Sequence, residues 1–211
     1  MRNEILIALR ATLVTLILTG LVYPLCTTGA AALLFGERAG GSLAHNENGQ
    51  VVGSELIGQA FATPAYLQGR PSAAGNGYDA TASSGSNYGT TSQKLRDRVV
   101  ADVTRLRQEN PEAPLPIPDD LVTASASGLD PELAPEAALW QAPRIARARG
   151  VTQDRIRAVI ENRIEGRDLG FLGEARVNVL GLNLMLDQQF GRPQPRGPAA
   201  PAAATTSLGT R

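Results

Sequence analysis

The stretch with the densest supply of reactive side chains is Tyr78–Gly89, which reads YDATASSGSNYG. A run of hydroxyls and glycines is what a serine nucleophile or a phosphate-binding loop requires. A second hydroxyl-rich run, DDLVTASASGLD, covers Asp119–Asp130. The chemistry of either run depends on the residues that the rest of the chain can bring beside it.

Neither run has the spacing of a known catalytic motif. A P-loop needs a lysine directly after its second glycine, but Lys94, the only lysine, lies five residues after Gly89. The Gly-x-Ser-x-Gly motif of serine hydrolases is absent, and Thr91 replaces the serine that a Ser-x-x-Lys motif would need before Lys94. The only histidine is His45, in a separate part of the chain. We therefore expect no catalytic residue and no enzyme activity of the chain by itself, with an anchored envelope serine hydrolase as the alternative.

Acidic and metal-binding residues are equally sparse. Asp79 and Asp130 could pair as two carboxylates, but an aspartate in a loop more often bonds its own backbone and forms a turn. The chain has one cysteine, Cys26, and one histidine, so neither an internal disulfide nor a zinc site of His and Cys ligands is expected. We predict no metal site, and no cofactor is expected from the chain's own motifs.

We interpret the polar side chains of the two runs as a partner-binding surface, because glycine and serine let the backbone approach a partner closely. The alternative is that the same groups bond only within their own domain. The residues concerned are Asn76, Tyr78, Asp79, Ser84, Ser86, Asn87, Thr123, Ser125, Ser127 and Asp130.

The N-terminal region must place these runs relative to a membrane. Ala11–Gly36 is 26 residues long without a charge, and about 20 apolar residues in a helix cross a bilayer. The apolar region of a cleaved signal peptide has only about 7–15 residues, so we favour an uncleaved anchor. Pro24 removes a backbone donor and predicts either a kink with helix partners in the membrane or a position near the outer interface.

Charges beside the span predict its orientation. Arg2 and Arg10 precede it, whereas Glu37 and Arg38 cancel each other after it. By the positive-inside rule, the N-terminus lies in the cytoplasm and everything after residue 36 is exported.

After the anchor, residues 39–53 read as a connector and 54–61 as one short helix or strand. A helix begins at Thr91 or Ser92 and ends at Asn110. Its buried stripe is expected to consist of Leu95, Val99, Val103 and Leu106.

The C-terminal part is expected to be helical. A helix over about 135–149 should kink or divide at Pro143 and stop at Gly150. The next helix is capped by Thr152 and stapled by Val151 and Ile156. Its buried face is expected to contain Ile156, Val159, Ile160 and Ile164. The run 177–186 reads as a final buried helix, with a strand as the alternative.

These elements define an α+β fold in three parts. They are a cytoplasmic N-terminus and transmembrane anchor over 1–36, one mixed extracytoplasmic domain over 37–190 and a disordered Pro/Ala-rich tail over 191–211. The formal net charge is zero, so nucleic acid is not an expected partner. We interpret the C-terminal arginines as a solvated helical surface rather than as a lipid or partner contact. They are Arg144, Arg147, Arg149, Arg155, Arg157, Arg163 and Arg167.

Six segments, taken in order, resemble the KdpC family, the small subunit of the bacterial high-affinity potassium-transporting P-type ATPase. The likeness extends from the anchor to about Phe190 and leaves out the tail, while Pro143 departs from regular helix geometry. The segments are GSELIGQAF (53–61), YLQGRPSA (66–73), YDATASSGSNYG (78–89), DLVTASASGLDP (120–131), ARARG (146–150) and RVNVLGLNLML (176–186).

The resemblance implies a single-pass subunit of the bacterial inner membrane with its C-terminal domain in the periplasm. Its partners would be a channel-like subunit that binds potassium and a P-type subunit that hydrolyses ATP, so ATP and potassium are handled by the complex. The family's small subunit stabilises assembly and is described as a catalytic chaperone that raises ATP affinity. Because the predicted topology separates the domain from ATP, we expect an indirect effect, with direct ATP binding as the alternative.

Overall fold

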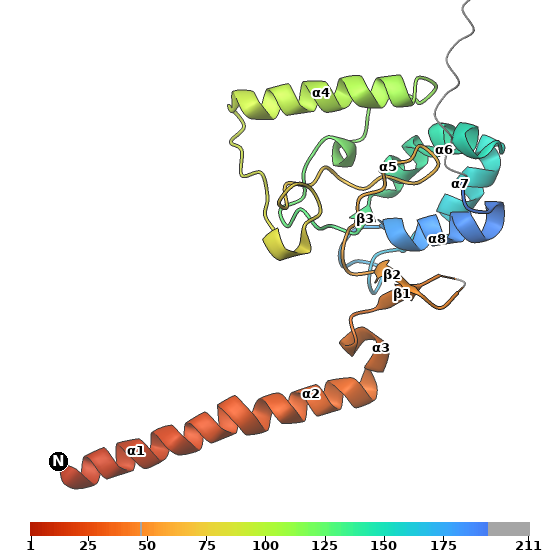
Figure 1. The fold of residues 1–211 in the computed structure, drawn as a ribbon. Coiled ribbons are helices and arrows are strands. Elements are labelled where there is room, and N and C mark those ends of the chain that lie inside the picture. Colours follow the sequence, from red (N-terminus) through yellow and green to blue (C-terminus); the bar gives the residue numbers. More distant parts are fainter. Residues whose placement is uncertain (47, 194–211) are drawn as a thin grey trace, which may run out of the picture.

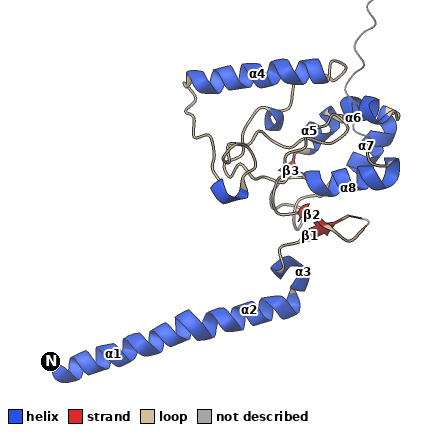
Figure 2. Cartoon of the chain, viewed as in Figure 1, coloured by secondary structure: helices blue, strands red, loops and turns tan. Residues whose placement is uncertain are grey.

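A computed structural model describes residues 1–46 and 48–193. Figure 1 shows two parts, a long N-terminal helix and a domain that begins beyond its far end. The domain is mainly helical, with strands confined to two short pairs (Figure 2). The mixed helix and strand composition that the sequence predicted is confirmed. Most of the predicted tail, from residue 194 onward, lies outside the described residues.

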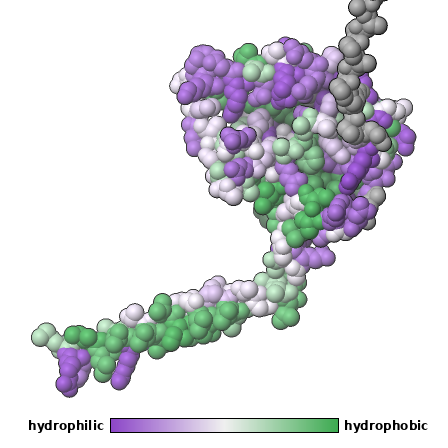
Figure 3. All heavy atoms as spheres, in the orientation of Figure 1, coloured by the Kyte–Doolittle hydropathy of each residue, from purple (hydrophilic) through white to green (hydrophobic). Residues whose placement is uncertain are grey.

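The N-terminal helix is continuous from Arg2 to Leu34 and is long and apolar enough to cross a membrane, with a mean hydropathy of 2.3 in its most apolar window. It consists of α1 (Arg2–Ile17), the π-helical turn η1 (Leu18–Val22) and α2 (Tyr23–Leu34). None of its residues is buried by the rest of the described chain. Figure 3 shows its apolar surface along most of its length, with polar side chains near the N-terminus.

Pro24 lies in the first turn of α2, directly after the π-helical turn. A proline ring removes one backbone donor from a regular helix, and a π-helical turn changes the local hydrogen-bond register. The Thr27 hydroxyl donates to the carbonyls of Tyr23, at 2.9 Å, and Pro24, at 3.1 Å. The helix is continuous through Pro24, and Figure 1 shows no sharp kink between α1 and α2, so the first of the two alternatives for Pro24, a kink, is not seen.

The short helix α3 (Gly36–Ala39) leads into a hairpin that the sequence did not predict. Its strands β1 (Leu43–His45) and β2 (Val51–Ser54) are antiparallel, in the region read as a connector. The Asn46 side chain accepts hydrogen bonds from the N–H groups of Asn48 and Gln50, at 3.0 and 2.9 Å, and so forms the turn. The predicted element over 54–61 is wrong, because the strand ends at Ser54 and 55–61 contain no helix or strand.

Helix α4 (Gln93–Glu109) confirms the helix that was predicted to begin at Thr91 or Ser92. Leu106 is buried, and the other three members of the predicted stripe are half-buried. Ser92 occupies the N-cap position, although its side chain makes no capping hydrogen bond. A proline-rich stretch over residues 111–118 and the 3₁₀ turn η3 (Asp119–Leu121) then connect α4 to the rest of the domain.

Four helices and one strand pair supply most of the core, to which Leu67, Leu106 of α4 and Leu121 of η3 also belong. The helices are α5 (Pro135–Trp140), α6 (Ala142–Arg149), α7 (Gln153–Glu161) and α8 (Val179–Phe190). The strands β3 (Glu132–Leu133) and β4 (Val177–Asn178) pair antiparallel. Their fully buried side chains include Leu133, Ile145, Ile156, Ile160, Val177, Leu182 and Leu186.

The helix breaks follow the sequence closely. The predicted interruption at Pro143 divides the segment into α5 and α6, and Gly150 ends α6 in the left-handed conformation at φ 68°. Thr152 is at the N-cap of α7, and Val151 packs on the cluster that contains Ile156. The run 177–186 contains both alternatives, since β4 precedes α8 directly.

The prediction that the C-terminal arginines form a solvated surface is wrong for two of them. Arg144 is only 3% exposed, and the Arg149 side chain is only 2% exposed. Arg149 pairs with Asp187 at 2.9 Å and lies over the Tyr66 ring, with 5.1 Å between the guanidinium carbon and the ring centroid. The remaining five are exposed, as predicted; they are Arg147, Arg155, Arg157, Arg163 and Arg167. Both side chains donate to backbone carbonyls of another segment of the domain, Arg144 to Pro64 and Arg149 to Ala65.

Candidate functional site

The two hydroxyl-rich runs lie against each other in the structure. We call the segments 72–87 and 123–130 the loop pair. The Ser84 N–H donates to the carbonyl of Ser127 at 3.0 Å, and the Ser83 hydroxyl donates to the same oxygen at 3.0 Å. The Ser72 hydroxyl donates to the carbonyl of Gly128 at 2.6 Å. Segments separated by some 40 residues therefore form one polar surface.

Glycine permits this close approach of the two backbones. Gly128 has φ 68°, and a Cβ there would lie 2.7 Å from the Ala74 nitrogen and 2.7 Å from the Ser84 oxygen. A Cβ at Gly85 would lie 2.8 Å from the Ala126 oxygen. Since backbone atoms on both sides occupy the space of a side chain, the contact depends on glycine at these positions.

Tyr78 holds the start of the loop pair against Arg70. Its hydroxyl donates to the Arg70 carbonyl, and its N–H donates to the Ser72 hydroxyl oxygen at 2.8 Å. Burial, reinforced by the negative charge of Asp130, raises the pKa of Tyr78 to about 12, although Arg70 opposes the shift. The phenol therefore stays protonated at neutral pH and acts as a donor rather than as a nucleophile.

The two candidate carboxylates do not act as a pair. Asp130 forms an ion pair with Arg70 at 3.0 Å and accepts a hydrogen bond from the Glu132 N–H at 3.0 Å. Asp79 accepts from the N–H of Thr81 at 2.9 Å and from its hydroxyl at 2.7 Å, and these bonds lower the pKa of Asp79. The alternative interpretation of Asp79 as a turn-forming residue is confirmed.

Arg70 connects both segments and was missed from the sequence. Besides Asp130, it lies 3.8 Å from Asp120, and its Nε donates to the Thr123 carbonyl at 3.3 Å. Its position in the segment YLQGRPSA was the available signal. An arginine within a glycine- and proline-rich run lies in a loop, where its long side chain can bind several acceptors.

The ten predicted side chains divide into inward and outward groups. Ser125 is 6% exposed, and its hydroxyl oxygen accepts from the Gly128 N–H at 2.8 Å, so it is used inside the domain. Half-buried members are Tyr78, Ser86 and Asp130. Exposed members are Asn76, Asp79, Ser84, Asn87, Thr123 and Ser127. The outward group is the part of the loop pair that a partner can reach.

The serines of the loop pair have the partners of a folded loop. The Ser83 hydroxyl donates to the Ser127 carbonyl, and that of Ser84 donates to the Gly85 carbonyl at 3.1 Å. His45 lies in β1, outside the loop pair. Over residues 1–46 and 48–193, no group of three His, Cys, Asp or Glu side chains is arranged to hold a metal ion.

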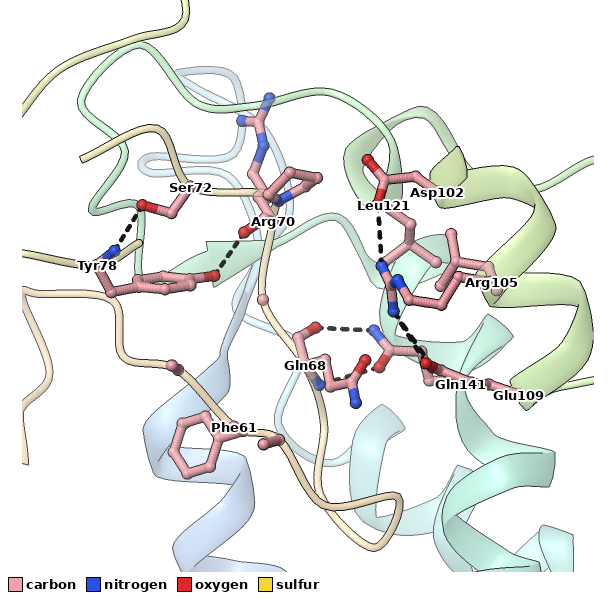
Figure 4. Close-up of a pocket in the computed structure, with 15 residues that line it drawn as sticks. Phe61, Gln68, Arg70, Ser72, Tyr78, Asp102, Arg105, Glu109, Leu121 and Gln141 are labelled. Atoms are coloured by element: carbon pink, nitrogen blue, oxygen red, sulfur yellow. Dashed lines mark hydrogen bonds and ion pairs between the residues drawn. The ribbon is translucent and has the colours of Figure 1, made fainter. Parts of the chain in front are cut away.

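A pocket of about 350 Å³ lies beside Tyr78, between the segment 60–72 and α4 (Figure 4). Its charged groups already have partners, since Arg105 pairs with Asp102 at 3.3 Å and with Glu109 at 3.2 Å. Gln141 fixes the opposite wall by accepting from the Gln68 N–H at 3.0 Å and donating to the Gln68 carbonyl at 3.0 Å. A phosphate-binding site would present free N–H groups, whereas the polar groups of this pocket are bonded to one another. The pocket is therefore better described as a packing contact between two segments.

Comparison with known proteins supports the resemblance seen in the sequence. A family model described as "KdpC: K+-transporting ATPase, c chain" matches residues 5–188. A "Potassium-transporting ATPase KdpC subunit" from Myxococcus xanthus is 58% identical over 191 residues, which cover 90% of each chain. Subunits with the same description from Koribacter versatilis (strain Ellin345) and Methylobacterium nodulans are 48% and 52% identical, covering 93% and 83% of this chain and 100% and 92% of theirs.

The match includes the N-terminal helix, the loop pair and the helical core, and it ends just before Phe190. The chain belongs to the KdpC family and is a subunit of the K+-transporting ATPase.

Proposed function

We propose that the chain is a non-catalytic subunit that holds the channel-like, potassium-binding subunit and the ATP-hydrolysing P-type subunit of the pump together. The single observation that carries this proposal is the helix Arg2–Leu34, none of whose residues is buried by the rest of the described chain. An apolar helix with every face uncovered can pack against neighbouring helices in the membrane. The anchor is accordingly the main site of assembly.

The flanking charges support an orientation with the domain in the periplasm. Arg2 and Arg10 lie at the N-terminal end of the helix, whereas Glu37 and Arg38 offset each other beyond it. In this orientation the domain faces away from ATP. The proposed rise in ATP affinity is therefore indirect and arises because the subunit binds one conformation of the ATPase better than another.

The outward side chains of the loop pair provide a second contact. Asn76, Asp79, Asn87, Thr123 and Ser127 present polar groups on backbone that is held in place by internal hydrogen bonds. A preformed polar surface loses little conformational entropy when a partner binds. We assign this surface to contact with the periplasmic part of a partner subunit.

Purification of the tagged chain in mild detergent after potassium starvation tests the subunit role. Two large membrane subunits and potassium-stimulated ATPase activity should be recovered. A matched variant replaces residues 11–34 with an unrelated apolar helix of equal length, so that anchoring is kept while the helix surface changes. We expect this variant to lose partner recovery, and the activity that remains should show a higher KM for ATP. Full recovery with the replaced helix would contradict the proposal.

A reporter fused after Phe190 tests the orientation. A reporter active only in the periplasm should be active, and one active only in the cytoplasm should be silent. The reverse pattern would mean that the domain lies in the cytoplasm, on the same side of the membrane as ATP. Nucleotide binding by the purified chain alone would then favour direct ATP binding as the route to higher affinity.

A further inference from the structure

Arg144 is a buried cation held by neutral oxygens. It lies in α6 and is 3% exposed. Its Nη1 donates to the Pro64 carbonyl at 2.7 Å and its Nη2 to the Gln141 side-chain oxygen at 2.6 Å. Its Nε takes part in none of the hydrogen bonds among the described residues. A guanidinium has five N–H donors, so donors remain for a further acceptor.

A comparison with Arg149, five residues later in the same helix, shows what Arg144 lacks. The Arg149 side chain is also buried, but it has Asp187 at 2.9 Å. Among ion pairs within residues 1–46 and 48–193, with an N–O distance of 4.0 Å or less, none includes Arg144. A buried charge without a counter-charge is costly, and buried arginines are normally paired.

Arg144 remains charged despite its burial. Burial lowers the pKa of Arg144 to about 10; the positive charges of Arg105 and Arg147 act in the same direction, while Glu109 opposes them. Since this pKa stays well above 7, the guanidinium is protonated at neutral pH. The folded domain therefore keeps a buried positive charge that forms no ion pair among the described residues and is offset only at longer range by Glu109.

This guanidinium lines a recess of about 290 Å³ together with Pro64, Gln68, Glu109 and Arg147. The only carboxylate among these lining residues, that of Glu109, is already bound to Arg105 at 3.2 Å. Figure 4 shows this Arg105–Glu109 pair in the neighbouring pocket, with which the recess shares Gln68 and Glu109. The recess is therefore lined by two arginines. Arg144 is buried and forms no ion pair among the described residues, whereas Arg147 is exposed and pairs with Glu112 at 3.3 Å.

We propose that this recess is a carboxylate-binding site with Arg144 as its principal ligand and Arg147 as the second cation. The planar fork of a guanidinium matches the two oxygens of a carboxylate. The size of the recess suits one acidic side chain of a partner subunit or one small free carboxylate. Either source would place a carboxylate within ion-pair distance of Arg144, which has no such partner among the described residues.

Malonate binding to the purified full chain in detergent tests the site, independently of the proposed subunit role. Malonate should raise the melting temperature relative to chloride at equal ionic strength and shift the Arg144 Nε–H resonance in NMR spectra. We expect R144Q to weaken malonate binding at least tenfold and R147Q several-fold. The matched control R157Q removes an exposed arginine from α7 and should leave binding unchanged.

Three outcomes would overturn the proposal. They are no malonate-specific effect in the natural chain, equal binding in R147Q and in the natural chain, or an equal effect of phosphate. Because R147Q changes an exposed side chain, it keeps the test valid if R144Q fails to fold. If malonate binds the chain and also releases partner subunits from the complex, the occupant is a partner's acidic side chain. If it binds without releasing them, the occupant is a free carboxylate.

Discussion

The N-terminal helix and the domain core use apolar residues in opposite ways. In the helix Leu16 is 62% exposed, whereas in α8 Leu182 is 0% exposed. The helix is held by its backbone hydrogen bonds, and its apolar side chains are exposed, as suits a helix that is long enough to cross a membrane. The core is held by side-chain packing within one chain. Mutations in the core should therefore report on folding, and mutations in the helix should report on assembly.

The largest effect is expected from Leu182→Ala. This change leaves a cavity in the core and should lower the free energy of unfolding of the domain by about 2–5 kcal/mol. Leu16→Ala is the matched control and should leave domain unfolding unchanged while reducing recovery of partner subunits. Denaturant unfolding followed by Trp140 fluorescence measures the first effect. Equal destabilisation by both variants would remove the distinction between the two regions.

Gly128→Ala should have the next largest effect, because it strains a positive φ and places a Cβ against two backbone atoms. We expect a loss of about 2–3 kcal/mol and faster hydrogen exchange at the Ser84 N–H. Gly89→Ala is the control, since no described residue beyond its two chain neighbours has an atom within 4 Å of the position that its Cβ would take, and its φ is not in the left-handed range. Unchanged exchange at Ser84 in Gly128→Ala would mean that the loop pair does not depend on this glycine.

The raised pKa of Tyr78 predicts that the free energy of unfolding falls at high pH. Its pKa rises from 10.0 to about 12 on folding, so the folded state holds the proton more tightly than the unfolded state. The resulting stabilisation is complete below pH 10 and is lost as the pH rises toward 12. After allowance for partial solvent exposure, it amounts to about 1–2 kcal/mol. The difference in unfolding free energy between the natural chain and Tyr78→Phe should shrink by this amount between pH 9 and 12, and a constant difference would contradict the assignment.

The smallest effect on folding is expected from Asn76→Ala and Thr123→Ala, which change exposed side chains of the loop pair. Each should alter stability by less than about 0.5 kcal/mol. If the loop pair is a docking surface, the double variant should weaken recovery of partner subunits several-fold. Ser125→Ala makes a useful contrast, since its buried hydroxyl should affect folding first. Unchanged recovery in the double variant would leave the helix as the main contact.

Local sequence signals predicted most of the helices. Pro143 and Gly150 act through their own backbone geometry, so their positions were correct from the sequence alone. Thr152 takes the predicted N-cap position, although its side chain makes no capping hydrogen bond. The β1–β2 hairpin was missed because its turn is made by the Asn46 side chain, which a composition-based reading counts as loop. Burial of Arg144 and Arg149 was missed because charged residues are seldom buried, and only tertiary packing places their acceptors.

The candidate site was predictable in its parts but not in its assembly. Both hydroxyl-rich runs were identified, yet their contact depends on long-range bonds such as Ser72 to Gly128. Arg70 was missed because its acceptors, Thr123 and Asp130, lie more than 50 residues away in the chain. Spacing along a sequence carries no direct information about such pairs.

The π-helical turn at Leu18–Val22 has a consequence for how the anchor tolerates changes in length. A π-helical turn takes up one extra residue within an otherwise α-helical segment. The side chains of α1 and α2 therefore point in nearly the same relative directions as they would in a regular α-helix that lacked one residue. A single-residue deletion within this turn should therefore leave the two halves facing the same directions. The same deletion elsewhere in α1 or α2 would rotate the domain by about 100° relative to the N-terminal end of the anchor.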